Sequence, residues 1–441
     1  MINAIRDVLC RNSRLMVSLL SAGVLIAAVG CPPSTGAWRS VLYPVNWTPS
    51  FEDNAGRYLH DFSYAGYHYG EDDPPNPAPG AVFNAVTGYG ADNTGASDTT
   101  AAIQSAIAAA SVAGGVVFLP EGLYRCDGVL SVTSPGVVIQ GEGQDKTKLY
   151  FTKTDGMAYN AHISFHGNVS RGTDILLAQD AESRSFDVYV NDASSLNVGD
   201  EVSLGWVITD EFIAEHNMTG TWVVFVGQWK PIFRRTVVAV DTSGTPDKVT
   251  FDVPLRYAAK MRDSASLREE SGYLSECGIE SLSVANAVDW DTAWSLNQVD
   301  AISMLNVKDC WMKNIGSFAS PHPDADGYHL QSNGLLVEQS KRVTVEDCHL
   351  ERSQNRGGGG NGYLFQVGTS NEVLTRDCVG LAGRHNFIQN WDFGTTGCVW
   401  LRCRSAGSTN MVSKDIPVGL PAYCEFHHSL SMACLVDSCL L

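Results

Sequence analysis

A short apolar strand that ends in cysteine recurs through the last third of the sequence. Its copies are Val307-Lys-Asp-Cys310, Val345-Glu-Asp-Cys348, Thr375-Arg-Asp-Cys378, Leu401-Arg-Cys403 and Val436-Asp-Ser-Cys439. The cysteines are 38, 30, 25 and 36 residues apart, so the unit repeats with loops of different length between copies. Repeats of this size are typical of solenoids, in which each unit stacks on the one before it. The pattern therefore predicts a stack of strands with equivalent positions above one another.

The first 30 residues have the features of an export signal. Three arginines precede an apolar run from Leu15 to Val29, which is too short for a membrane span. Ala28-Val-Gly-Cys31 resembles a bacterial lipobox, which implies lipidation of Cys31; an ordinary signal peptide is the alternative. Both predict an exported protein, which is periplasmic, outer-membrane or cell-surface as a lipoprotein and otherwise secreted. Membrane contact would be through the lipid anchor alone.

The repeated cysteines are expected to be free thiols. The sequence has 12 cysteines, and an exported protein with so many would usually contain disulfides. Here their spacing predicts one inward row of buried thiols, at Cys310, Cys348, Cys378, Cys403 and Cys439. A second buried row would contain Leu305, Val343, Val373, Cys398 and Cys434. Disulfides are the alternative, and zinc is disfavoured because there is no Cys-x-x-Cys pair.

The charge balance limits the class of partner. Asp and Glu number 48 and Lys and Arg number 30, for a formal net charge of −18. Nucleic-acid binding is not expected, because phosphate neutralisation needs a basic surface. An acidic polysaccharide would need a local basic patch.

A helix followed by short strands is predicted after residue 80. The proline-rich stretch 71–80 cannot continue a helix or a central strand and is interpreted as a linker. The helix is expected over 99–112, with Asp98 as its cap and Gly114-Gly115 at its end. Its apolar face would contain Ile103, Ala106, Ile107 and Ala110. Strands are expected over 116–119, 129–132, 137–139 and 149–151.

These elements carry a resemblance to a known superfamily. Tyr89-Gly-Ala-Asp92, Asp98-Thr-Thr-Ala-Ala-Ile-Gln104, Gly114-Gly-Val-Val-Phe-Leu-Pro-Glu-Gly-Leu-Tyr124 and Val138-Ile-Gln-Gly-Glu-Gly143 are similar to the start of the pectate-lyase superfamily. The resemblance implies an all-β, right-handed parallel β-helix whose N-terminal helix caps the stack. It does not imply one reaction, since lyases, glycoside hydrolases and phage tailspikes all have this fold.

The rest of the chain divides into an insertion and the main stack. The division is a signal peptide over 1–30, an N-terminal segment and linker over 31–80, the capping helix and first rungs over 81–155, an inserted antiparallel β subdomain over 156–275 and the main rungs over 276–441. In the insertion, Trp206, Trp222 and Trp229 lie near Lys230, Arg234 and Arg235, so they either stack on sugars or form the subdomain core. The apolar end at Leu440-Leu441 has no capping segment, which predicts a truncated form of a longer protein.

The polar residues of the last four units are expected to meet on one outer face. Alignment of the units on their cysteines places these residues just ahead of each apolar strand, and stacked strands lie about 4.8 Å apart. We predict catalytic roles for His329, Tyr363, Arg384 and His385. We predict substrate contacts for Arg356, Asn361, Gln366, Asn386, Gln389, Trp391 and His428.

These residue types favour β-elimination from an anionic, uronate-containing polysaccharide. Elimination needs a base, a group that neutralises the carboxylate and a proton donor. His385 would be the base, Arg384 or Arg356 with Asn386 the neutralising group, and Tyr363 the donor. The resemblance implies an Arg or Lys base in related lyases, sometimes with calcium, so Ca²⁺ is a candidate cofactor.

Two other functions stay open. Hydrolysis needs two carboxylates, and Asp324 and Asp326 are candidates, with Asp392 or Glu425 as partners. The Asp-x-Asp pair is equally compatible with a turn or a calcium site. The paired aspartates and Arg-x-Lys of polygalacturonase-type hydrolases are absent, which disfavours hydrolysis. The third function is non-catalytic glycan binding or adhesion.

Overall fold

The computed structural model describes residues 39–76, 78–414, 416–418, 422–428 and 430–441. The expected export signal and Cys31 lie outside the described residues. The chain has two compact units, which divide between Leu59 and His60. In the described part of the first unit, the Asp53 carboxylate accepts hydrogen bonds from the backbone of Ala55 and from the backbone and side chain of Arg57. Among the described helices, none is sufficiently long and apolar to span a membrane.

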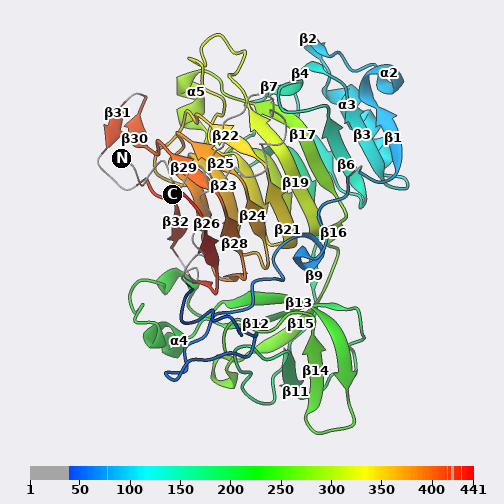
Figure 1. The fold of residues 1–441 in the computed structure, drawn as a ribbon. Helices are drawn as coiled ribbons and strands as arrows, with labels where there is room; N and C mark the ends of the chain where they lie inside the picture. Colours follow the sequence, from blue (N-terminus) through cyan, green and yellow to red (C-terminus); the bar gives the residue numbers. More distant parts are fainter. Residues whose placement is uncertain (1–38, 77, 415, 419–421, 429) are drawn as a thin grey trace, which may run out of the picture. The chain divides into compact units, whose positions relative to one another are not determined.

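The second unit is a parallel β-helix with three faces (Figure 1). Its first face has strands paired in parallel from one end of the stack to the other. In order, they are β1 (Ala81–Asn84), β3 (Gly115–Leu119), β6 (Val137–Gly141), β17 (Gly278–Ala285), β19 (Val307–Ser317), β21 (Lys341–Glu346), β24 (Leu374–Arg376), β28 (Val399–Leu401) and β34 (Leu435–Asp437). Short additions at its edge are β16 (Leu274–Ser275), β27 (Thr395–Thr396) and β33 (Ser431–Met432).

The second face continues from the first through β17 and β19, which are long enough to belong to both. The additional strands of this face are β2 (Thr94–Asp98), β4 (Gly122–Cys126), β7 (Thr147–Phe151), β22 (His349–Glu351), β25 (Val379–Leu381) and β29 (Arg404–Ala406). The third face is a separate parallel sheet. Its strands are β5 (Leu130–Val132), β8 (Ala161–His166), β18 (Asp300–Leu305), β20 (Leu335–Glu338), β23 (Tyr363–Gly368), β26 (His385–Asn390) and β32 (Glu425–His427).

A residue with left-handed backbone conformation precedes each repeated cysteine. These residues are Asp309, Asp347, Asp377, Arg402 and Ser438, with φ between 50° and 54°. A left-handed residue turns the strand sharply, and Asp is one of the residue types that tolerates this conformation best. Each turn directs the next side chain inward, and Cys310, Cys348, Cys378 and Cys403 are buried. All ten described cysteines are free, as the spacing predicted.

The prediction that the five cysteines share one row is wrong for Cys310. Cys310 is paired with Val343, because β19 spans two faces and its cysteine lies at the first corner rather than the second. Its row therefore contains Cys277, Cys310, Val343, Val373, Cys398 and Cys434. The other row contains Cys348, Cys378, Cys403 and Cys439. Leu305, expected beside Val343, instead lies on the third face beside Glu338.

A helix packs over the first strands of the stack. This helix, α3 (Thr100–Ala110), buries Ile103, Ala106, Ile107 and Ala110, which is the predicted apolar face. Thr99 is the N-cap, and Asp98 accepts a hydrogen bond from the Thr100 backbone instead of capping the helix as predicted. Other short helical elements are η1 (Tyr67–Gly70), α2 (Ala85–Tyr89), α4 (Asp210–Glu215), η2 (Val223–Phe225), η3 (Met261–Asp263) and α5 (Trp290–Ser295).

Residues just before the stack, expected to form a linker, contact it closely. Tyr67 is 4% exposed, and its hydroxyl donates a 2.7 Å hydrogen bond to Glu276. Its ring packs edge-on against Trp311. Asp73 forms an ion pair with Arg376. This segment is therefore held on the first face of the β-helix.

The insertion is an antiparallel β subdomain, drawn in green in Figure 1. It begins later than residue 156, because β8 pairs in parallel with β5 and β18 of the third face. Its strands are β9 (Ser170–Arg171), β10 (Ile175–Leu176), β11 (Asp187–Val190), β12 (Glu201–Val207), β13 (Trp229–Asp241), β14 (Asp247–Phe251) and β15 (Ser266–Ser271). The entry strand β9 pairs with the exit strand β15, through Ser170 with Ser271 and Arg171 with Glu270.

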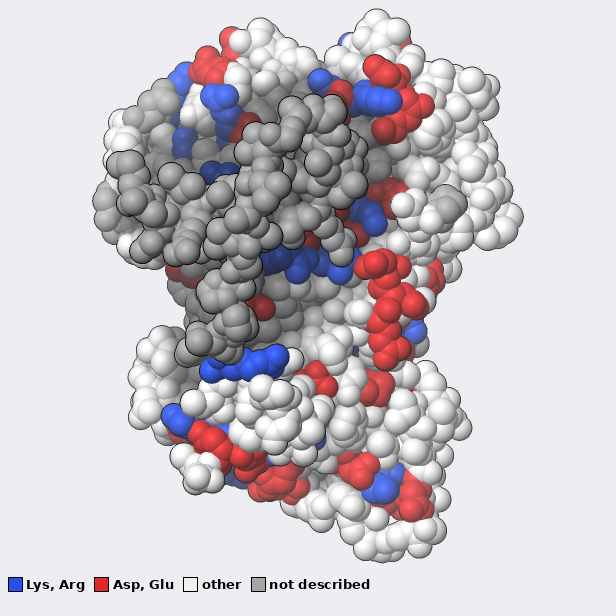
Figure 2. Space-filling view, in the orientation of Figure 1, with Lys and Arg blue, Asp and Glu red and all other residues white. Residues whose placement is uncertain are grey.

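Buried ion pairs join the insertion to the first face of the β-helix. Glu201 pairs with Lys308 and Lys341, and Glu372 pairs with Arg235 and Arg256. Both arginine side chains are fully buried. A buried charge is costly unless it is paired, so these contacts fix where the insertion packs. Figure 2 shows that basic and acidic side chains also lie close together in several places on the surface.

The insertion's tryptophans and arginines do not form a sugar-binding surface. Trp206 and Trp222 belong to the subdomain core, at 1% and 5% exposed. The guanidinium carbon of Arg268 lies over the Trp229 ring, 3.9 Å from the centroid of that ring. Arg234 is buried and donates to the Thr369 carbonyl with a side-chain N–H. The alternative of a subdomain core is therefore correct for Trp206 and Trp222, whereas Trp229 is only partly buried.

Candidate functional site

A groove of about 610 Å³ lies over the third face of the β-helix. Core residues such as Leu335 and Val337 alternate along β20 with the lining residues Leu336 and Glu338, so the groove is on the outer side of the sheet. Its lining residues come from five strands and the loops beside them. They are Tyr159, Gln298, Asp300, Asn333, Leu336, Glu338, Gly359, Gly360, Tyr363, Gln366, Arg384, Asn390, Trp391, His427 and His428.

Strand register arranges the outward positions of the third face in two rows. Leu336, Gln366, Ile388 and Glu425 occupy equivalent positions on consecutive strands. Glu338, Gly368, Asn390 and His427 form the next row. Neighbouring strands are about 4.8 Å apart, so side chains from four rungs lie within reach of one extended ligand.

Asp300 is a buried carboxyl group at the start of β18. It is 6% exposed, and its Oδ1 has no hydrogen-bond partner among the described residues. Burial raises the pKa of Asp300 to about 8; a hydrogen bond from Asn333 opposes this shift, and the charge of Glu338 adds to it. Asp300 is therefore a neutral acid at pH 7, which is the state of a proton donor.

Glu338 is the second carboxyl group of the groove, at the end of β20. Burial raises its pKa, while Arg234 lowers it and the nearby charge of Asp392 raises it. Asp300 and Glu338 lie on adjacent paired strands and interact electrostatically. The groove thus has two carboxyl groups, and burial raises the pKa of both.

Five of the sequence-predicted residues line this groove together: Tyr363, Gln366, Arg384, Trp391 and His428. Arg384 donates a 2.7 Å hydrogen bond to the Gly357 carbonyl and stands 6.0 Å from the centroid of the Tyr363 ring. Burial raises the pKa of Tyr363, so its hydroxyl stays protonated. Trp391 is half exposed, which leaves its ring available to a ligand.

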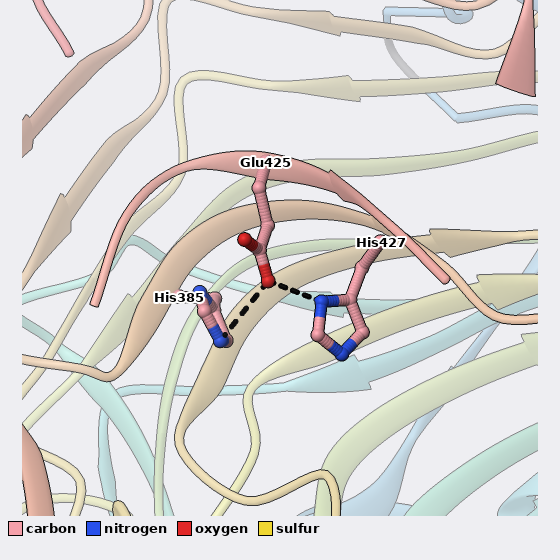
Figure 3. Close-up of side chains that lie close together, drawn as sticks. All are labelled: His385, Glu425 and His427. Carbon is pink, nitrogen blue, oxygen red and sulfur yellow. Dashed lines mark ion pairs between the residues drawn. The ribbon is translucent and has the colours of Figure 1, made fainter. Parts of the chain in front are cut away.

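Beside the groove, His385 of β26 meets Glu425 and His427 of β32 (Figure 3). His385 Nε2 is 3.3 Å from Glu425 Oε1, and His427 Nδ1 contacts the same oxygen. His385 Nδ1 is 2.6 Å from the Tyr423 carbonyl oxygen. His385 is 1% exposed and is not a lining residue, so the predicted base does not reach the groove directly. His427 does line it, and burial lowers the pKa of His427 to about 4.

The structure places His329 and Arg356 elsewhere. His329 Nδ1 is 2.9 Å from Ser317 Oγ, and its Nε2 is 3.5 Å from Glu351, on the second face. Arg356 donates a 3.2 Å hydrogen bond to the Tyr328 hydroxyl. Neither residue lines the groove.

Three predicted amide residues also point away from the groove. Asn361 accepts from the Gln298 backbone and the Ser332 hydroxyl, which holds the glycine-rich loop in place. Asn386 donates to the carbonyls of Gly380 and Ala406 inside a turn. Gln389 is 1% exposed, and its amide has no partner among the described residues. We have no physical account of that buried amide.

The acidic residues expected for hydrolysis or calcium are not grouped. Asp326 accepts 2.9 Å and 3.0 Å hydrogen bonds from Trp290 Nε1 and Lys414 Nζ. Asp392 pairs with Lys230 at 2.6 Å. Within the described ranges, His385, Glu425 and His427 are the one group of three residues suited to a metal ion.

Sequence reasoning missed Asp300 and Glu338 and did not assign His427 a role. The signal that the sequence offered was the alternation of inward and outward side chains along each strand. In Leu335-Leu-Val-Glu338 the first and third residues are buried, so the second and fourth face outward. The same reasoning applied to every strand of the third face would have found Glu338 and His427.

Known proteins are similar to this chain in fold. Residues 82–207 match the family model described as rhamnogalacturonase A/epimerase, pectate lyase-like. The matched segment is pectate lyase-like. It covers the first rungs and part of the insertion, and ends before the strands that carry most of the groove. No curated protein matches the sequence.

Several solved structures are similar to part of this chain at low sequence identity. The tailspike gp61 of Pseudomonas phage phi297 is 12% identical, with a TM-score of 0.42, over 74% of this chain and 65% of that one. The tailspike gp49 of Pseudomonas phage LKA1 is 14% identical, with a TM-score of 0.37, over 74% and 63%. An iota-carrageenase complexed to iota-carrageenan fragments is 11% identical, with a TM-score of 0.37, over 79% and 53%. The matched regions therefore span about half to two thirds of these relatives.

Proposed function

We propose that this protein is a polysaccharide-cleaving enzyme that hydrolyses glycosidic bonds in the groove of the third face. The observation that carries the proposal is Asp300, a buried carboxyl group in the groove whose Oδ1 has no hydrogen-bond partner among the described residues, with Glu338 as a second carboxyl group on the neighbouring strand. The family name matched by residues 82–207, which includes a rhamnogalacturonase, supports a glycan substrate. The sequence-based expectation of export agrees with a substrate outside the cell.

In this mechanism Asp300 is the general acid. A carboxyl group that keeps its proton at neutral pH can protonate the oxygen of the departing sugar. Glu338 is the second carboxylate, which either activates water or attacks the sugar directly. Trp391 provides a surface on which a sugar ring stacks, and Gln366 and Asn390 provide hydrogen bonds.

The groove favours a substrate with some negative charge. Among the described lining residues, Arg384 is the one with a permanent positive charge, and it lies next to Tyr363. A guanidinium group binds a carboxylate or sulfate through charge-assisted hydrogen bonds. We therefore propose an acidic polysaccharide, such as one that contains uronate.

β-Elimination is the second candidate. The observation that favours it is the position of Arg384, Tyr363 and His427 around one end of the groove. Arg384 would neutralise the substrate carboxylate, neutral His427 would remove the proton, and Tyr363 would protonate the leaving oxygen. This assignment transfers the base role from His385 to His427, because His427 lines the groove.

The two reactions are separated by their products. The purified protein is incubated with a panel of acidic and neutral polysaccharides, while new reducing ends and the ultraviolet absorbance of unsaturated uronate are measured. Hydrolysis gives reducing ends without that absorbance, and elimination gives both. Neither signal on any polysaccharide would contradict an enzymatic role and favour glycan binding.

Carboxyl variants then test the assignment. Asp300→Asn and Glu338→Gln keep the side-chain shape and should each lower kcat by about 10²–10⁴-fold. Glu351→Gln is the matched control, because Glu351 is a carboxylate beside histidines on the second face. Full activity of Asp300→Asn would exclude this residue as the acid. Loss of activity in Glu351→Gln as well would point to a general effect on folding.

A further inference from the structure

Two imidazole rings and one carboxylate converge beside the groove. One ligand atom each from His385, Glu425 and His427 lies within 4.8 Å of the others. Figure 3 shows the three side chains pointing toward a common space between β26 and β32. The strands place them there, because Ile388 pairs with Glu425 and Asn390 pairs with His427 in the parallel register.

Two of these ligand atoms are buried and lack hydrogen-bond partners. His385 Nε2 and Glu425 Oε1 are inaccessible, and within the described part of the chain neither makes a hydrogen bond; the Glu425 oxygen has ion-pair contacts with His385 Nε2 and His427 Nδ1 alone. Most buried polar atoms in proteins have a partner, so such an exception calls for an explanation. Both atoms face each other across 3.3 Å.

The backbone fixes which nitrogen of His385 carries the proton. The Tyr423 carbonyl oxygen, 2.6 Å from Nδ1, can only accept a hydrogen bond, so Nδ1 is the donor. In the neutral ring this leaves a lone pair on Nε2, which points at the Glu425 oxygen. A histidine that donates its second N–H to a carbonyl is the usual arrangement for a metal ligand.

We propose that His385, Glu425 and His427 bind a divalent transition-metal ion such as Zn²⁺. A cation between His385 Nε2 and Glu425 Oε1 would satisfy both lone pairs. Two ligands that are about 2.0–2.1 Å from a tetrahedral metal lie roughly 3.3 Å apart, in agreement with this pair. Two imidazoles and one carboxylate match the ligand preference of zinc and iron and not that of calcium, which takes six to eight oxygens.

Three protein ligands would leave at least one coordination position open. His427 also lines the groove, so the metal ion would stand at its border, where an open position is available to a sugar oxygen. The proposed site is compatible with hydrolysis by Asp300 and Glu338, but a metal-bound His427 could not also be the base of the elimination alternative. It concerns metal binding alone, and it holds even if the carboxyl groups have no catalytic role.

Metal binding is tested directly on the purified protein. The protein is first freed of metal with a chelator, and Zn²⁺ is then titrated by calorimetry, with Co²⁺ absorption spectra as a second readout. We expect one equivalent of Zn²⁺ to bind and to raise the melting temperature. Glu425→Gln and His427→Ala should each weaken binding at least about tenfold.

The chain contains a matched control. His329, Glu351 and His349 are also two histidines around a glutamate, at 3.5 Å and 3.7 Å, yet they do not bring three ligand atoms together. Glu351→Gln should therefore leave Zn²⁺ affinity unchanged. Absence of stoichiometric binding, or equal affinity in the wild type and Glu425→Gln, would overturn the proposal. Circular dichroism confirms folding, and since Glu425 and His427 are partly exposed, their variants carry the test if His385→Ala unfolds.

Discussion

Arg342 donates two hydrogen bonds to Asp309, from Nε to Oδ1 and from Nη2 to Oδ2, and each is 2.7 Å long. The side chains are only 5% and 11% exposed. Arg342 also contacts Asp252 of the insertion at 3.1 Å. The same two-bond geometry recurs between Arg402 and Asp377, at 2.7 Å and 2.5 Å, but there the side chains are 51% and 37% exposed.

The buried Arg342–Asp309 pair and the exposed Arg402–Asp377 pair allow a controlled test of how burial changes the contribution of an ion pair to stability. Arg342→Met should lower the free energy of unfolding by about 3–5 kcal/mol, because it leaves the buried Asp309 carboxylate without its cation. Arg402→Met should lower it by less than about 1 kcal/mol, because water solvates Asp377. Both arginines have left-handed backbone conformation, with φ of 53° and 52°, so the substitutions are matched in local strain. Urea unfolding curves measure both, and equal losses would contradict the argument.

The raised pKa of Asp300 predicts a pH dependence of stability. The folded protein keeps this proton to a pKa of about 8, while the unfolded chain loses it near the ordinary pKa of an aspartate, about 3.9. Between these values the folded state binds more protons, so the Asp300 contribution to stability falls as pH rises. Asp300→Asn should remove this slope. The comparison is urea unfolding of the wild type and the variant at several pH values from about 5 to 8; parallel curves would refute the shift.

Trp391 is predicted to contribute to substrate binding rather than to the chemical step. Its ring is 50% exposed and lines the groove. Stacking that is equal in the ground state and the transition state changes KM and leaves kcat unaltered. Trp391→Ala should raise KM about three- to tenfold, in keeping with ring contacts of ~0.5–1.5 kcal/mol. Trp391→Phe is the control and should retain most of the affinity; a fall in kcat alone would assign Trp391 another role.

Thiol reactivity should follow the burial of the cysteines. Burial raises the pKa of Cys126 to about 12 and that of Cys378 well above its ordinary value, so neither forms the reactive thiolate at pH 8. Alkylation of the native protein followed by mass spectrometry should modify the partly exposed Cys424, Cys434 and Cys439 first. The buried cysteines should react only in denaturant. A mass that indicates a disulfide within either row would contradict free stacked thiols.

The strand repeat and the α3 face could be predicted from the sequence because they depend on local pattern. A strand that ends in an inward cysteine and a helix with Ile103, Ala106, Ile107 and Ala110 on one side both bury a periodic apolar set. The corners could also be anticipated, since Asp precedes three of the five repeated cysteines and tolerates a left-handed conformation. These features need no knowledge of distant contacts.

The register of Cys310, and the positions of Asp300 and Glu338 in the groove, depend on contacts between residues that are distant in the sequence. The long strand β19 follows two faces, so Cys310 lies one corner earlier than its motif suggests. Asp300 lies outside every cysteine unit, and the burial that raises its pKa comes from rungs far away in sequence. Alignment of short motifs cannot reveal which residues surround a side chain.

The pairing of β9 with β15 has a consequence for how the chain folds. Because Ser170 lies beside Ser271, the two ends of the insertion meet inside the subdomain itself. Loop-closure entropy rises only slowly with loop length, and here the subdomain's own folding brings the ends together. The insertion of about a hundred residues therefore leaves and rejoins the β-helix at neighbouring points, as a tight hairpin would. Such an arrangement lets the subdomain close on itself, while its ion pairs with Lys341 and Glu372 hold it on the stack.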